Sequence, residues 1–146
     1  MTDQTTASSA LPDLSLDAAS RFVAAAGLVV DEVSGTRVRG HLDLGPEHYT
    51  PWGVVHGGVY TTAVESAASI GATAAVAARG QYAVGLHNAS DFLRAATTGR
   101  ADVLAEPLYQ GRTQQLWLIT ITNQQGKDLA RGQLRLQNIS RDSSPY

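Results

Sequence analysis

The stretch VVHGGVYTTAVESAAS, residues 54–69, decides the fold. Two glycines follow His56, and a segment without proline then runs to Arg79 and Gly80. Its eight alanines between residues 57 and 79 favour a helix of roughly 22 residues, about 33 Å long. Because this segment is apolar nearly all round, we expect the rest of the chain to enclose the helix.

Glu65 is the unusual residue of this predicted helix. A carboxylate is costly to bury unless it is paired or faces a site, so its place among alanines suggests a functional role. The alternative is an ordinary glutamate on an exposed stripe of the helix. Ser69 lies one turn later on the same face. It is predicted either to orient Glu65 or a water molecule, or simply to pack as a small residue.

Length and composition predict one globular domain. The chain has 146 residues, of which 43% are hydrophobic and 16% charged. A net charge of −2 gives no sign of a nucleic-acid partner or a membrane surface. The absence of cysteine excludes disulfides, thiolate metal ligands and a cysteine nucleophile, and agrees with a cytoplasmic location. We see no secretory signal and no apolar run long enough to cross a membrane.

The domain is predicted to span residues 14–140. Residues 1–13 are rich in Thr, Ser and Asp and are expected to form a disordered tail, and residues 141–146 a flexible C-terminal tail. Within the domain, Ser15 can cap a short helix for which Gly27 is the stop signal.

A β-hairpin should follow the short helix, formed by residues 28–33 and 36–44. In its second half Val38, Leu42 and Leu44 alternate with polar residues, which is the pattern of a half-buried strand. Prolines and glycines make residues 45–53 an irregular loop.

Four more strands are predicted after the long helix, at residues 82–94, 100–109, 113–123 and 127–139. Short turns separate them, so we expect successive strands to pair antiparallel. The simplest packing wraps one curved antiparallel sheet around the long helix, which is an α+β architecture.

One central helix wrapped by an antiparallel sheet is the hotdog fold. Residues 54–69 resemble the active-site segment of hotdog thioesterases of the phenylacetate-pathway type, which include 4-hydroxybenzoyl-CoA and 1,4-dihydroxy-2-naphthoyl-CoA thioesterases. In that group a His-Gly-Gly turn opens the helix, an acidic residue follows nine positions after the His, and a hydroxyl residue follows four positions further on. Residues 87–117 also resemble the third strand and Gly-Arg turn of the family. The resemblance covers roughly residues 15–139 and implies an acyl-CoA thioesterase for aromatic or medium acyl groups.

The resemblance assigns roles around the start of the helix. The backbone N–H groups of Gly57 and Gly58 lack helical partners and can hold an oxyanion. His56 is expected to brace the turn, a role close to that of a purely structural histidine. Glu65 attacks the thioester carbonyl directly, or it activates water as a general base. The family commonly has Gln or Asn six positions before the His, where this chain has Thr50.

The other site residues are predicted from their places beside the glycine turn or from their match to positions in the family. His48 or Tyr49 is the alternative to Thr50 if the loop is shifted. We expect an acyl pocket and a rim of basic groups for the coenzyme A phosphates; plain packing and solvated turns are the alternatives. The residues concerned are Trp52 and Tyr60 beside the glycine turn, Asn88 and Asp91 on the strand facing the acyl pocket, and Arg94 and Arg112, with Gly111 and Thr113 beside Arg112, near the nucleotide.

The resemblance further implies an obligate homodimer with shared active sites, and a homotetramer as a pair of dimers is consistent with it. No cofactor is expected, since coenzyme A is part of the substrate, and no metal-ligand spacing is present. A hotdog hydratase would place a histidine on the long helix, and residues 57–79 contain none. A Gly-x-Ser-x-Gly motif is also missing, which argues against a serine hydrolase of the α/β type. The remaining alternative is a non-catalytic acyl-CoA sensor.

Overall fold

The computed structural model describes residues 15–143, so the predicted tail at residues 1–13 and the final residues 144–146 lie outside it. Residues 141–143, expected to be part of a flexible tail, form a 3-10 turn. The elements in chain order are the 3-10 helix η1 (Leu16–Ala18), α1 (Arg21–Ala26), β1 (Val29–Ser34), β2 (Arg37–Leu44), η2 (Pro46–His48), α2 (Gly57–Val76), η3 (Ala77–Arg79), β3 (Gln81–Phe92), β4 (Gly99–Gln110), β5 (Gln114–Thr122), β6 (Asp128–Ser140) and η4 (Arg141–Ser143).

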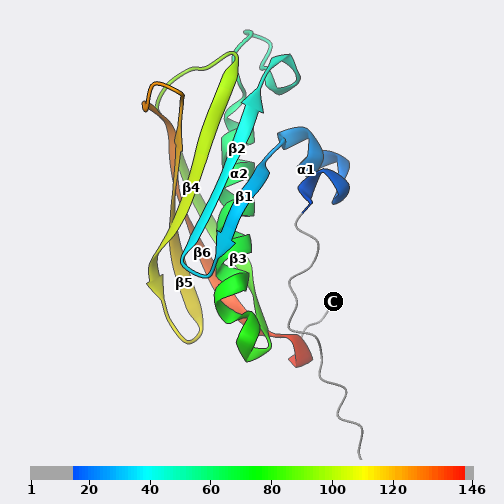
Figure 1. Ribbon diagram of the computed structural model, residues 1–146, viewed down its shortest axis with the longest axis vertical. Helices are drawn as coiled ribbons and strands as arrows, with labels where there is room; N and C mark the ends of the chain where they lie inside the picture. Colours follow the sequence, from blue (N-terminus) through cyan, green and yellow to red (C-terminus); the bar gives the residue numbers. More distant parts are fainter. Residues whose placement is uncertain (1–14, 144–146) are drawn as a thin grey trace, which may run out of the picture.

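The strands form one six-stranded antiparallel sheet in the order β1-β2-β4-β5-β6-β3. The long helix α2 runs along one face of this sheet, as Figure 1 shows. The predicted α+β architecture, with a long central helix against a curved antiparallel sheet, is therefore confirmed. No helix among residues 15–143 is long and apolar enough to cross a membrane.

The expected pairing of β3 with β4 is wrong. β3 pairs with β6, while β4 lies between β2 and β5. β3 and β4 are three strand positions apart, a distance of about 14 Å, and an extended link of six residues reaches about 20 Å. Residues 93–98 are therefore long enough to cross the end of the sheet, and they pass the start of α2, where the Ala96 carbonyl accepts from Val55 N–H at 2.9 Å. β3 becomes an edge strand of twelve residues.

The two faces of α2 have different surroundings. The residues that face the sheet are small and fully enclosed: Ala63, Val64, Ala67, Ala68 and Ala72 are each 0% exposed. A Cβ built on Gly71 would lie 2.5 Å from the Trp117 ring, so glycine is required there. On the opposite face Thr61 and Ser69 are half-buried and Glu65 is exposed. The expectation that the chain encloses this helix is therefore wrong, because a single sheet covers only one side of it.

Two local predictions also need correction. Ser15 makes no capping hydrogen bond, and the helix expected after it is split: Ser20 caps α1 by accepting from Val23 N–H at 3.2 Å. Gly27, with a φ of 81°, ends α1 as expected. The loop after β2 is not entirely irregular, because residues 46–48 form the 3-10 helix η2.

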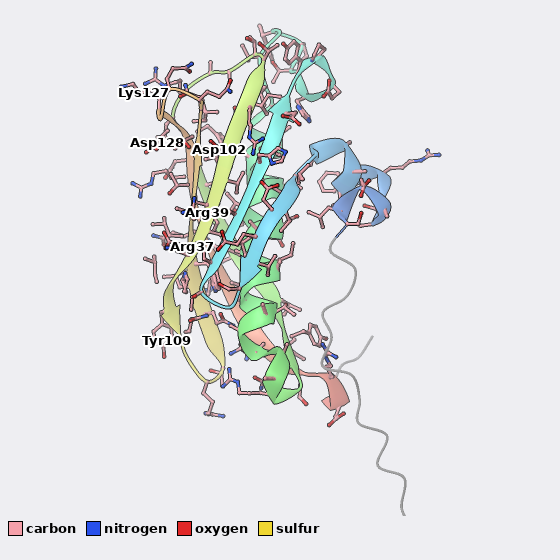
Figure 2. The ribbon with its side chains drawn as sticks, in the orientation of Figure 1. Arg37, Arg39, Asp102, Tyr109, Lys127 and Asp128 are labelled. Carbon is pink, nitrogen blue, oxygen red and sulfur yellow. The ribbon has the colours of Figure 1, made fainter. Side chains whose placement is uncertain are left out.

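The face of the sheet away from α2 carries charged side chains. Arg37, Arg39 and Asp102 lie on β2 and β4 on this side (Figure 2). Arg37 pairs with Glu106 at 3.4 Å, and both side chains are 46% exposed, so the pair adds little stability. Their alternation with buried residues such as Val38 produces the period-two pattern predicted for β2.

Candidate active site at the start and middle of α2

The start of α2 leaves one backbone donor unused. His56 is the N-cap residue, and its Nδ1 accepts from Gly58 N–H at 2.8 Å. The His56 carbonyl accepts from Val59 N–H at 3.0 Å. Within residues 15–143, Gly57 N–H has no hydrogen-bond partner. His56 thus braces the turn, as predicted, and leaves the Gly57 amide as the available donor, at the positive end of the helix dipole.

The environment of Gly57 requires glycine. A Cβ at this position would lie 2.6 Å from Cε2 of Phe92, at the end of β3. The Phe92 ring also packs against Tyr60, with ring centroids 6.3 Å apart. Gly57 therefore lies between the helix start and an aromatic ring, where any side chain would displace Phe92.

Glu65 lies on the uncovered side of α2, next to β3. Its Oε1 is 2.9 Å from where a Cβ of Gly85 would be, and its Oε2 is 3.5 Å from Asn88 Nδ2. Ser69, one turn further on, makes no hydrogen bond to this carboxylate within the described part of the chain. Glu65 and Gly57 are eight positions apart on one helix, which separates their backbones by about 12 Å.

The loop before α2 places three predicted residues. His48 is 5% exposed; its Nδ1 accepts from Gly45 N–H at 3.3 Å and its Nε2 donates to the Ala25 carbonyl at 3.0 Å. Both ring nitrogens have partners within the chain, which does not favour the alternative that His48 contacts the thioester. Thr50 Oγ1 accepts from Trp52 N–H at 3.2 Å, which leaves the hydroxyl free to donate its proton. The Trp52 side chain is 85% exposed.

Tyr60 faces the sheet and not the solvent. It is 3% exposed, and its hydroxyl has no hydrogen-bond partner within residues 15–143. Burial raises the pKa of this phenol above its ordinary value. Tyr60 thus belongs to the core, which matches the plain-packing alternative for this residue.

A groove of about 550 Å3 lies between α1 and the first half of α2. Its wall is largely apolar, with hydroxyl groups and the N-cap histidine at one side. Phe22, from α1, is 71% exposed and is a member that the sequence reasoning missed, because nothing in a six-residue helix indicates which cavity it borders. The lining residues are Phe22, Ala25, Ala26, Glu47, His48, Tyr49, His56, Gly58, Val59, Thr61 and Thr62.

The two arginines predicted near the nucleotide lie at opposite ends of the sheet. Arg94 follows β3 at the end where α2 begins, whereas Arg112 lies in the β4–β5 turn, at the end where α2 stops. The turn residues Gly111, Arg112 and Thr113 are held by Asn138, which bonds to all three of their carbonyls. One chain therefore does not bring both arginines to one site.

Arg112 has a neighbour that the sequence reasoning missed. A cavity of about 280 Å3 is lined by Arg79, Arg112 and Gln115, together with small residues at the end of α2. Gln115 is 1% exposed, and its amide oxygen and nitrogen both have hydrogen-bond partners.

Asp91, predicted to face the acyl pocket, is exposed and lies opposite Arg131 of β6. Ser90 and Phe92, which flank Asp91 in β3, point toward the helix. Because side chains alternate along a strand, Asp91 points away from the helix.

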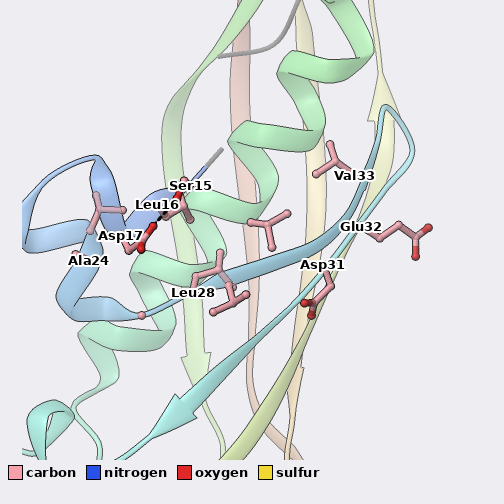
Figure 3. Close-up of a pocket in the computed structure, with 12 residues that line it drawn as sticks. Ser15, Leu16, Asp17, Ala24, Leu28, Asp31, Glu32 and Val33 are labelled. Atoms are coloured by element: carbon pink, nitrogen blue, oxygen red, sulfur yellow. Dashed lines mark hydrogen bonds between the residues drawn. The ribbon is translucent and has the colours of Figure 1, made fainter. Parts of the chain in front are cut away.

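A further groove lies between the N-terminal helices and β1, with a volume of about 540 Å3 (Figure 3). Asp31, Glu32 and Val33 of β1 form one side, and Leu16 and Ala24 lie on the other. None of the predicted site residues lines it, so the candidate active site is the region around α2 and β3.

Comparisons with known proteins agree with this fold. Residues 53–130 match the family model described as the Thioesterase superfamily. The Mycobacterium tuberculosis protein named "Putative esterase Rv1847" is 44% identical over 115 residues, which cover 77% of this chain and 82% of that protein. A solved structure of that protein has a TM-score of 0.79 and covers 82% of this chain and 96% of its own.

Two further relatives extend the likeness. The Arabidopsis thaliana protein named 1,4-dihydroxy-2-naphthoyl-CoA thioesterase 2 is 38% identical over 97 residues, or 65% of this chain and 60% of its own. The crystal structure of AziG from S. sahachiroi is 34% identical, with a TM-score of 0.79, and covers 83% of this chain and 98% of its own.

The fold and the matched segment define a hotdog-fold thioester hydrolase. The chain belongs to the thioesterase superfamily, and the matched residues 53–130 include both Gly57 and Glu65. These matches favour hydrolysis over the sensor alternative considered from the sequence.

Proposed function

We propose that this protein is an acyl-CoA thioesterase of the phenylacetate-pathway type, which hydrolyses an aromatic or medium-chain acyl-CoA to the free acid and coenzyme A. One observation carries the proposal: α2 presents an exposed carboxylate, Glu65, and an unpartnered amide, Gly57 N–H. A carboxylate and an oxyanion donor are the two groups that thioester cleavage needs. The name of the Arabidopsis relative supports the same substrate class.

Two chemical routes are open to Glu65. As a general base, it takes a proton from water while the water oxygen attacks the carbonyl carbon; the C–S bond then breaks and the thiolate leaves with that proton. As a nucleophile, it forms an anhydride as the thiolate leaves, and water then hydrolyses the anhydride. In both routes Gly57 N–H donates to the developing oxyanion. Label found in Glu65 after a single turnover in 18O-labelled water would demonstrate the anhydride route, because the general-base route puts the water oxygen only into the product acid.

The site requires two subunits. A nucleophile and an oxyanion donor must both lie about 3 Å from the same carbonyl group, whereas Gly57 and Glu65 of one helix are about 12 Å apart. We therefore place Glu65 of one subunit beside Gly57 of the other, in a homodimer with two shared sites. The uncovered face of α2 is where a second helix can pack.

Strand β3 provides the means of joining the two subunits. It is an edge strand of twelve residues, and no other strand within residues 15–143 pairs with its outer side. Antiparallel pairing of two β3 strands about a two-fold axis places the two α2 helices antiparallel on the same sheet. In a symmetric dimer each Gly57 lies equally far from Glu65 of the other subunit. The two-fold axis therefore passes near Thr61, which lies midway between Gly57 and Glu65 along α2. The same reversal brings the end that carries Arg112 beside the end of the other subunit that carries Arg94.

The substrate can then be placed by chemistry. The groove between α1 and α2 begins at His56 and Gly58, next to the oxyanion donor, and its apolar wall of Phe22 and Val59 suits the acyl group. Arg94 and Arg112 would meet the coenzyme A phosphates as bidentate donors. Thr50 has a free hydroxyl proton for the thioester oxygen or the water.

The test is a thiol-release assay with a panel of aromatic, medium-chain and short-chain acyl-CoAs, run with the wild type and with Glu65→Gln. We expect turnover of aromatic or medium-chain substrates, and a loss of about 10²- to 10⁴-fold in kcat for Glu65→Gln, since the variant keeps the shape but loses the base. Wild-type turnover in this variant would contradict the proposal. Native mass measurement checks the dimer, and also the tetramer that the sequence predicted.

A further inference from the structure

The strand β3 contains one extra residue, and it changes which side chains face Glu65. Gly85 pairs with Leu136 and His87 with Arg135, so Leu86 has no counterpart on β6 and forms a β-bulge. Before the bulge, Ala83 and Gly85 face α2. After it, Asn88, Ser90 and Phe92 face α2, since their partners on β6 are the buried Leu134, Gly132 and Ala130. Strict alternation from Gly85 would instead have turned His87, Ala89 and Asp91 toward the helix.

The bulge places two features of β3 next to Glu65: the side-chain amide of Asn88, and Gly85, which has no side chain. Asn88 Nδ2 donates to the Thr61 carbonyl at 3.1 Å and approaches Glu65 Oε2 at 3.5 Å, which is longer than a typical N–H···O hydrogen bond. Glu65 Oε1 occupies the space that a Cβ of Gly85 would need, at 2.9 Å. The carboxylate is thus bounded on one side by the backbone of β3 and on the other by an amide.

Ser90 fixes the orientation of that amide. Its Oγ donates to Asn88 Oδ1 at 2.7 Å, which leaves the NH2 group of Asn88 directed at the helix. A flipped amide would place its oxygen against the Thr61 carbonyl, two acceptors without a proton between them. The chain Ser90 to Asn88 to Glu65 therefore has one stable direction.

We infer that Asn88 is a positioning residue for the Glu65 carboxylate, and that Gly85 and the Leu86 bulge exist to make room for it. The inference rests on the proposed function, because it assigns Asn88 to the carboxylate that does the chemistry. It differs from the sequence prediction, in which Asn88 faced the acyl group. Asn88 does not touch substrate in this account; it acts through Glu65.

The test measures kcat, KM and thermal stability for Asn88→Ala, Asn88→Asp and Gly85→Ala in the homodimer. We expect kcat to fall about tenfold to 10²-fold, with KM changed less than about twofold, because the carboxylate is misplaced while the substrate site is intact. Asn88→Asp should be the most severe of these, since it puts a second negative charge beside Glu65. The control Ala89→Ser, on the opposite face of β3, should have wild-type kcat.

A double variant separates positioning from substrate contact. In a Glu65→Gln background, adding Asn88→Ala should cause no further loss of kcat, because the group that Asn88 orients is already absent. A further loss of tenfold there would overturn the inference, since Asn88 would then act on the substrate itself. Ser90→Ala should give a smaller loss than Asn88→Ala, because the amide remains but can rotate.

The failure of this inference is distinct from the failure of the proposed function. If Glu65→Gln retains wild-type turnover, the proposed function is wrong, and the inference fails with it. If Glu65→Gln is inactive while Asn88→Ala and Gly85→Ala both keep wild-type kcat, only the positioning role is overturned. If either Asn88→Ala or Gly85→Ala unfolds, the other variant still tests the inference, since each perturbs the Glu65 carboxylate from a different side.

Discussion

The two long faces of α2 differ in which parts of the molecule pack against them. The face toward the sheet is rich in alanine and includes Gly71, so the helix backbone lies close to the strands, and these residues are buried within one chain. The other face carries Thr61 and Ser69, which are half-buried, and Glu65, which is exposed, so residues 15–143 cover it only in part. The comparison teaches that the first face determines the fold, whereas the second becomes a site only when another subunit packs against it.

The largest expected difference separates two adjacent residues, Val64 and Glu65, which lie on the two faces. Val64→Ala should lower the free energy of unfolding by about 2 kcal/mol, because it leaves a cavity against the sheet, while the kcat of the folded protein stays near wild type. Glu65→Gln should instead lower kcat, while the free energy of unfolding stays unchanged within about 0.5 kcal/mol. Urea unfolding and thiol release on both variants check this. If both variants lose stability equally, the distinction between the faces is wrong.

A second pair tests how closely the sheet approaches the helix. Gly71→Ala should lower the free energy of unfolding by about 1–3 kcal/mol, since the added Cβ would lie 2.5 Å from the Trp117 ring. The matched substitution on the other face, Ser69→Ala, adds no Cβ and should be neutral or slightly stabilising, because alanine has the higher helix propensity. Thermal melts measure both changes. A stabilising Gly71→Ala would contradict the close packing described for this face.

A smaller effect is expected in the groove beside the uncovered face. Phe22→Ala should reduce kcat/KM for an aromatic acyl-CoA about tenfold, because a large apolar wall is lost, while acetyl-CoA turnover changes less than about twofold. The melting temperature should hardly change, since Phe22 is 71% exposed. Equal losses with both substrates would show that the acyl group binds elsewhere.

The smallest effect concerns the hydroxyl of Tyr60, a buried polar group on the sheet-facing side of α2 that has no hydrogen-bond partner within residues 15–143. Burial raises the pKa of the Tyr60 phenol, so above about pH 10 the unfolded chain releases this proton while the folded chain keeps it. Its contribution to stability is therefore complete below that pH and lost as the pH rises. Tyr60→Phe should be neutral or more stable by up to about 1 kcal/mol at pH 7, since the hydroxyl has no partner. Urea unfolding should also show less alkaline loss in this variant. Destabilisation by more than 1 kcal/mol would indicate a missing partner.

The sequence was sufficient where local rules decide the structure. The proline-free, alanine-rich segment gave the helix, His56 lies at its N-cap, and the alternation of residues gave the β2 strand. The pairing of β3 was not predictable from turn length, because strand order depends on contacts between β3 and β6, far apart in the chain. The sequence also did not show which residues of β3 face α2. That depends on the bulge at Leu86, which leaves no recognisable pattern in the sequence of this strand.

The candidate site was predictable in part. The spacing of His56, Gly57 and Glu65 could be read directly, and the free amide of Gly57 agrees with its predicted role. The exposure of Glu65 was not predictable, because an apolar helix surface looks the same whether its own chain or a second subunit covers it. The same limit applies to Arg94 and Arg112, which a single chain keeps apart.

The most direct measurement of the central claim, that each site combines Glu65 of one subunit with Gly57 of the other, is complementation between two inactive chains. One chain carries Glu65→Gln. The other carries Gly57→Pro, which removes the amide hydrogen, together with Phe92→Ala, which removes the ring that a Cβ at position 57 would strike. Proline suits this first helical position, and His56, with ψ of 134°, has the extended conformation that precedes proline.

Each chain alone should be inactive, and the Phe92→Ala chain alone serves as the active control. When the two are co-expressed, half of the dimers are mixed and each has one intact site with Phe92 beside Gly57, so we expect about a quarter of the wild-type activity. Complete inactivity, in a sample whose mass shows mixed dimers, would contradict the account.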